Sequence, residues 1–121
     1  MKVGHEERFI KVRNDLLQYC KGLIAVKVGE EFHDWLTLEG DVSFGKGYIR
    51  IFKSEFKDCT TDNTERQLLF AAKNLVFAID AYMSTGKADE ADILSFINNF
   101  ITCQLDAVDT WCDIVSYYGY V

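Results

Sequence analysis

Three aspartates near the C-terminus have the spacing that most clearly suggests a site. Asp106, Asp109 and Asp113 follow one another at intervals of three and four residues, so on an α-helix they project within about 60° of one another. Asn99 and Thr102 lie beside them on the same polar face. Aligned like charges destabilise a helix by about a few tenths of a kcal/mol per close pair. The sequence therefore predicts a partner-binding face here, and a solvated face that maintains solubility is the alternative.

The distribution of charge along the chain favours the binding interpretation. The net charge is −6, and residues 1–60 hold ten basic and ten acidic side chains, whereas residues 61–121 hold three basic and nine acidic ones. We therefore expect a non-enzymatic protein that binds a basic protein partner. In bacterial terms this is the character of an acidic cytosolic inhibitor or immunity protein that neutralises a cationic toxin. The comparison rests on composition, because no family motif is present.

Motifs for catalysis, cofactors and nucleic acid are absent. The chain has no phosphate-binding loop, dinucleotide-binding fingerprint or nucleophile elbow. Neither histidine, His5 or His33, is close in sequence to a cysteine, and the segment that carries the aspartates contains no histidine, so we predict no enzyme, metal or cofactor. A pI of about 4.8 argues against nucleic acid. The one contrary feature is a modest strip of basic and aromatic residues: Lys46, Tyr48, Arg50, Phe52, Lys53 and Lys57.

The cysteines and the hydropathy pattern predict a reduced, cytoplasmic protein. The four cysteines contain no Cys-x-x-Cys pair, which argues against a zinc site and favours free, buried thiols that behave as small hydrophobic groups. Cys103 and Cys112 are nine residues apart and would point to opposite sides of a helix. No apolar run is long enough for a signal peptide or a membrane span, so we expect no membrane partner.

The elements that must position these residues indicate a single domain, 1–121, with an α+β fold. An apolar period of 3.6 residues predicts an N-terminal helix from Glu6 to Cys20. A small antiparallel sheet or hairpin is expected next, from a strand over 23–28 and two strands, 42–44 and 48–52, around Gly45-Lys46-Gly47. Residues 30–38 fit a helix or a strand, and we favour a strand.

Two long antiparallel helices are predicted to complete the fold. Asp62 is expected to cap the first, which should end near Met83 with Gly86 after it. The second should begin at the acidic residues after Asp89 and reach about Tyr117.

The helix expected to begin at Asp62 has two apolar sides. The broader side includes Leu68, Leu75 and Ile79, and Phe70 and Phe77 form a second stripe nearly opposite. One interpretation places this helix between the last helix and either the sheet or the first helix, which would cover both sides. The other makes the phenylalanine stripe a homodimer or partner interface, and the protein a self-associating structural or regulatory module.

Overall fold

The computed structural model describes residues 3–26, 29–86 and 89–118. Within these ranges the chain forms helices joined by turns and short irregular segments. The α-helices are α1 (Val3–Val26), α2 (Gly29–Trp35), α3 (Asp41–Phe56), α4 (Asp62–Met83) and α5 (Glu90–Tyr118), with a π-helical segment η1 (Leu36–Gly40) and a 3-10 turn η2 (Lys57–Cys59).

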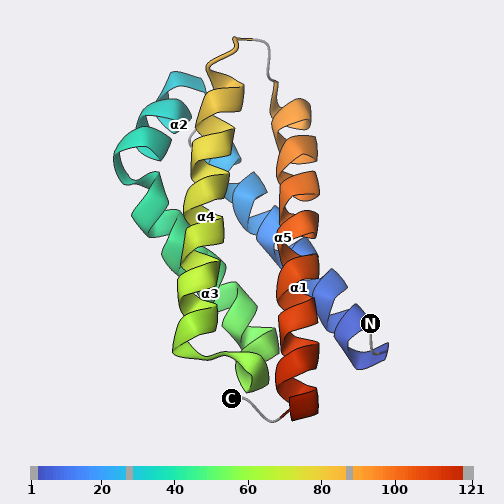
Figure 1. The fold of residues 1–121 in the computed structure, drawn as a ribbon. Helices are drawn as coiled ribbons and strands as arrows, with labels where there is room; N and C mark the ends of the chain where they lie inside the picture. Colours follow the sequence, from blue (N-terminus) through green and yellow to red (C-terminus); the bar gives the residue numbers. More distant parts are fainter. Residues whose placement is uncertain (1–2, 27–28, 87–88, 119–121) are drawn as a thin grey trace.

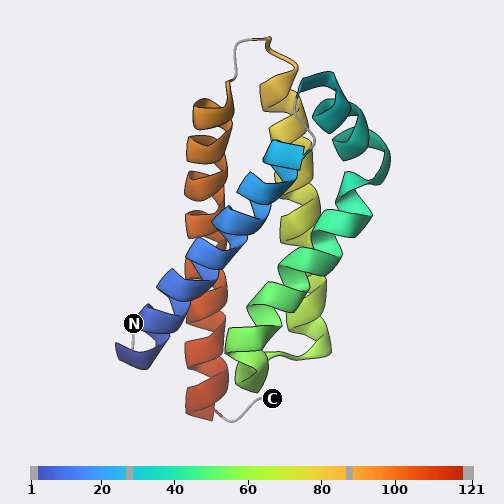
Figure 2. The same cartoon turned by 180° about the vertical axis from the view of Figure 1, so that it is seen from behind.

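The four long helices enclose one core. α4 and α5 run antiparallel and side by side, and α1 and α3 cross behind them (Figures 1 and 2). α1 packs against α3 and α5, and α4 packs against α3 and α5, so each long helix touches two others. None of the described helices combines the length and apolar character that a membrane span requires.

The predicted α+β fold is wrong, because no described residue belongs to a strand. The expected hairpin over 42–52 is instead α3. Its aromatic residues recur every fourth position, as Phe44, Tyr48, Phe52 and Phe56, and all four are buried. Every second residue of a half-buried strand faces the core, whereas every third or fourth does so in a helix, and the aromatic spacing matches the helix.

The same spacing begins further upstream, at Phe32. Phe32, Leu36 and Gly40 are buried and continue the four-residue period into Phe44. An α-helix has 3.6 residues per turn, so a strict period of four drifts around its surface. The π-helical segment, whose hydrogen bonds span one residue more, offsets part of that drift. The strand favoured for 30–38 is therefore wrong, and the segment is helical.

The first helix is longer than predicted. Its buried stripe of Val12, Leu16 and Cys20 continues to Ile24, so the helix passes through Gly22 and includes most of the segment expected as a strand. Gly22 costs about 1 kcal/mol relative to alanine inside a helix. The burial of Ile24 offsets that cost, because fully covering such a side chain contributes about 1.5–3 kcal/mol.

The glycines expected to form a hairpin turn serve close helix packing instead. A Cβ atom on Gly47 would collide with the ring of Tyr19 on α1, and one on Gly45 would lie 3.0 Å from Leu69 Cδ1 on α4. The Tyr19 hydroxyl donates to the Ser43 carbonyl oxygen at 3.3 Å. α3 therefore approaches both neighbouring helices through positions that lack side chains.

The two C-terminal helices are confirmed with small shifts at their ends. The N-cap of α4 is Thr61, one residue before the predicted Asp62, and its hydroxyl accepts from the Thr64 amide at 3.2 Å. Gly86 follows α4 with φ = 74°, a conformation that glycine adopts without strain. Asp89 caps α5 by accepting from the Asp92 amide at 2.8 Å.

All four cysteines are free thiols, and three are buried. Cys112 is buried and Cys103 is exposed, on opposite sides of α5 as their spacing predicted. The prediction that the thiols are buried is therefore wrong for Cys103. Burial raises the pKa of the Cys20 thiol to about 12. Burial also raises the pKa of Cys112, helped by the neighbouring Cys59 thiol and the charge of Asp109.

These thiols should differ sharply in reactivity, because the thiolate is the nucleophile and the core excludes reagents. At pH 8, we expect one thiol per chain, Cys103, to react rapidly with a chromogenic disulfide reagent. The other three thiols should react at least about 100-fold more slowly, at the rate at which the helices open. Cys103→Ser should abolish the rapid phase, and a second rapid thiol in that variant would contradict the packing described here.

Candidate protein-binding surface

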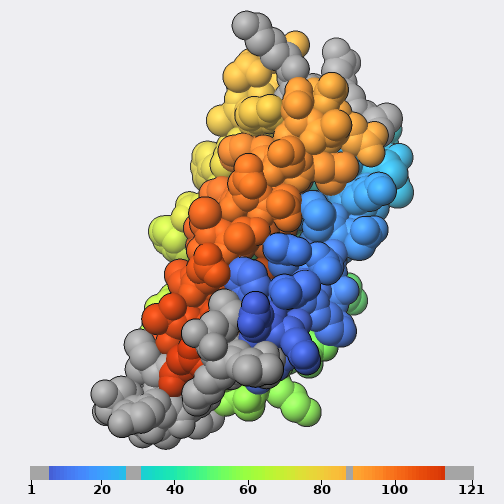
Figure 3. All heavy atoms as spheres, turned by 90° about the vertical axis from the view of Figure 1, so that its right-hand side faces the viewer, coloured from blue at the N-terminus to red at the C-terminus, as the bar shows by residue number. Residues whose placement is uncertain are grey.

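The structure separates the predicted acidic site residues. Asn99 and Asp106 are exposed on the outer face of α5, and Figure 3 shows α5 beside α1 on this side of the molecule. Thr102 is half-buried, and its hydroxyl donates to the Asn98 carbonyl oxygen at 2.8 Å. Asp113 is also half-buried. Asp109 is only 5% exposed, so the three aspartates do not form one accessible acidic strip.

Asp109 is covered because it lies at the edge of the polar arc. On the opposite edge of α5, the Trp111 indole donates to the Thr64 hydroxyl of α4 at 2.7 Å. Since α5 packs between α4 and α1, the Asp109 edge faces α1. The periodicity of α5 alone could not predict which part of its polar face α1 would cover.

The phenylalanine stripe of α4 lies on the surface. Phe70 is 68% exposed and Phe77 is 77% exposed. Their azimuths differ by about 20° at 100° per residue, two turns apart on one face. The opposite side of the helix, with Leu68, Leu75 and Ile79, is buried as predicted. The expectation that neighbouring elements cover both sides of α4 is wrong.

Two further exposed apolar residues come from the segment that was predicted to be extended. Leu38 in η1 is 80% exposed and Val42 in α3 is 55% exposed. They follow directly after Thr37 and Asp41, which line a cavity of about 170 Å³ together with Phe77. The sequence analysis missed them, although the helical spacing of Phe32, Leu36, Gly40 and Phe44 could have placed them outside the core.

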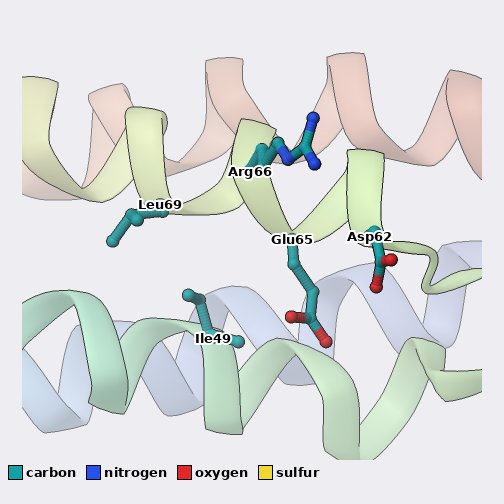
Figure 4. A pocket seen from close by; sticks show the side chains of 5 residues that line it. All are labelled: Ile49, Asp62, Glu65, Arg66 and Leu69. Atoms are coloured by element: carbon teal, nitrogen blue, oxygen red, sulfur yellow. The ribbon is translucent and has the colours of Figure 1, made fainter.

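We call this surface the α3–α4 face and define it by its exposed apolar side chains: Leu38, Val42, Leu69, Phe70 and Phe77. A second cavity, of about 260 Å³, lies at its other end between Ile49 and Leu69. In Figure 4, Glu65 and Asp62 point from α4 toward α3, whereas Arg66 extends along α4. The face thus runs along both helices, with a hollow at each end.

Charges surround the apolar residues of the face. Asp41 and Asp80 line the cavity beside Phe77, and Asp80 Oδ1 lies 2.9 Å from His33 Nε2, which ties α2 to α4. At the other end Arg66 lines the second cavity, and Lys53 pairs with Glu65 across the two helices. Arg66 and Lys73 are exposed beside the phenylalanines.

The described side chains do not assemble a metal site. No three His, Cys, Asp or Glu residues in the described ranges lie close enough to hold an ion. His33 contacts two aspartates, Asp34 and Asp80. Comparisons with protein-family models, curated proteins and solved structures gave no match to this chain.

Proposed function

We propose that this protein is a non-enzymatic protein-binding module and that the α3–α4 face is its binding surface. The observation that carries the proposal is the exposure of Phe70 and Phe77 on a chain whose core is built from other residues. Fully burying a phenylalanine contributes about 1.5–3 kcal/mol. The isolated chain forgoes most of that stabilisation at two positions, and a partner that covers them would recover it.

The arrangement of the apolar residues supports a binding surface over ordinary surface variation. Single exposed hydrophobic residues are common and need no explanation, whereas a contiguous group with a charged rim is typical of interaction sites. Here Phe70 and Phe77 share one side of α4, and Leu38 and Val42 directly follow two residues that line a cavity with Phe77. The π-helical segment that carries Leu38 adds support, because such segments often occur at functional sites.

A second candidate is the acidic inhibitor or immunity-type protein, which would bind a basic protein such as a toxin through the outer face of α5. Asp92, Asn99 and Asp106 are exposed there, and the chain has no lysine or arginine from residue 88 onward. The burial of Asp109 removes one charge from that surface. We therefore rank this candidate below the α3–α4 face.

Photo-crosslinking in living cells tests both candidates together. The photoreactive residue p-benzoylphenylalanine would replace Phe70 or Phe77 on the α3–α4 face, Asn99 on α5, or Lys21 on α1 as an exposed control. We expect protein adducts at positions 70 and 77 that exceed those at 21 by about tenfold or more, because a bound partner keeps the reactive ring in contact with C–H bonds.

The pattern of adducts decides between the surfaces. Adducts at position 99 alone, with a basic protein, would favour the acidic candidate and reject the α3–α4 face. Equal background labelling at 21, 70 and 77 would also reject it. Circular dichroism of each variant would verify that the helices remain folded.

A further inference from the structure

We infer that the occupant of the α3–α4 face is a second copy of this chain, related by a two-fold axis that places the two α4 helices antiparallel. The inference rests on the proposed function and identifies its partner. It derives from the order of side chains along α4, where one register pairs the phenylalanines and brings Arg66 near Asp80. A two-fold interface uses the same surface twice and must be complementary to itself.

The apolar part of the match follows from the spacing of the phenylalanines. Phe70 and Phe77 are seven residues apart, which is about 10.5 Å along a helix. If the axis passes between Lys73 and Asn74, Phe70 of one copy lies opposite Phe77 of the other, and the pair occurs twice. Both rings are more than two-thirds exposed, so no rearrangement of the core is needed to bring them together.

The same register aligns opposite charges. Arg66 lies opposite Ala81 of the second copy, one residue from Asp80, and both charged side chains lie on the α3 side of the phenylalanine stripe. Arg66 is exposed and Asp80 is half-buried. Two Arg66–Asp80 pairs would therefore form at the rim. Complementary rim charges of this kind set the register of an interface more than its affinity.

The neighbouring helix contributes to the same interface. The two-fold axis is perpendicular to α4 and lies in the plane of the contact. The α3 helices of the two copies therefore lie on the same side of the α4 pair. Leu38 in η1 and Val42 at the start of α3 then lie near the axis, because Asp41 lines a cavity with Phe77 and Gly45 packs against Leu69. This arrangement places apolar residues of both helices at the contact.

Sedimentation equilibrium of the purified full chain tests the inference. We expect a dimer at micromolar concentration, and Phe77→Glu should raise its dissociation constant about 100-fold, because it places a charge in the apolar centre. Arg66→Asp should raise the dissociation constant about tenfold, and adding Asp80→Arg should reverse that increase. Ser95→Glu, on the exposed face of α5, is the matched control and should leave the dimer unchanged.

Disulfide trapping tests the register. In a Cys103→Ser background, chains carrying Phe70→Cys and chains carrying Phe77→Cys would be mixed and oxidised. We expect 70–77 disulfides to outnumber 70–70 and 77–77 disulfides. Like positions in the two copies lie about 10 Å apart along the direction of the α4 helices, whereas a disulfide requires Cα atoms within about 7 Å. Predominant like-position disulfides would overturn the antiparallel arrangement.

Failure of this inference differs from failure of the proposed function. A purified chain that stays monomeric at 100 µM, together with cellular adducts of other proteins at position 77, would overturn the second copy and retain the binding surface. A monomeric chain without adducts at 70 or 77 would overturn both. A Phe77→Glu variant that folds and still dimerises would reject this face as the contact between copies.

Discussion

Replacing Phe52 by alanine is expected to destabilise the protein by about 3–5 kcal/mol, the range for removing a buried phenylalanine. Phe52 is 1% exposed, and its ring stacks on Phe56 with centroids 4.8 Å apart. The substitution leaves a cavity between α3 and the rest of the core that the surrounding helices can fill only in part. Chemical denaturation followed by far-ultraviolet circular dichroism measures the loss.

Phe70→Ala is the matched control, since it removes the same side chain from the surface of α4. At a protein concentration low enough to suppress association, it should change the free energy of unfolding by less than about 0.5 kcal/mol. If the two variants lost equal stability, the assignment of Phe52 to the core and Phe70 to the surface would be wrong. The comparison thus tests the orientation of both helices.

Replacing Thr64 by valine should lower the free energy of unfolding by about 1–3 kcal/mol, because it leaves the indole N–H of Trp111 without its acceptor. Thr64 is fully buried, and its hydroxyl accepts from the Trp111 indole at 2.7 Å. That hydroxyl also lies 3.1 Å from the Thr61 hydroxyl and 3.5 Å from the Cys59 carbonyl oxygen. Valine keeps the shape of threonine and replaces only the hydroxyl, with a methyl group.

The Trp111→Phe variant isolates this hydrogen bond. With the indole absent, Thr64→Val no longer leaves a donor without an acceptor. Its effect on the free energy of unfolding should therefore be smaller by about 1 kcal/mol or more. Equal effects of Thr64→Val in both backgrounds would show that the indole contact contributes nothing. The far-ultraviolet spectrum of the double variant would verify that α4 and α5 still form.

Several features of the fold were determined locally and were therefore predictable. The C-terminal helices follow from apolar periodicity together with caps at Asp89 and Gly86, and these signals act within a few residues of the chain. The placement of Cys103 and Cys112 on opposite sides of α5 follows from their spacing in the same way. The net charge of residues 61–121 is likewise a property of the sequence itself.

The middle of the chain was mispredicted because two local signals conflict there. Segments such as 48–52 are rich in aromatic and branched residues, which favour strands, and the glycines at 45 and 47 resemble a turn. In the structure these glycines leave space for the side chains of Tyr19 from α1 and Leu69 from α4. Those contacts come from residues more than twenty positions away, so only the packing of three helices explains the glycines.

The same limit applies to the binding surface. The sequence by itself determined that α4 has two apolar sides and that α5 is acidic, because a helix fixes the direction of each side chain relative to its neighbours. It did not determine which sides are covered. Only the tertiary structure buried Asp109 and left Phe70 and Phe77 exposed, because burial depends on which distant helix packs over each face.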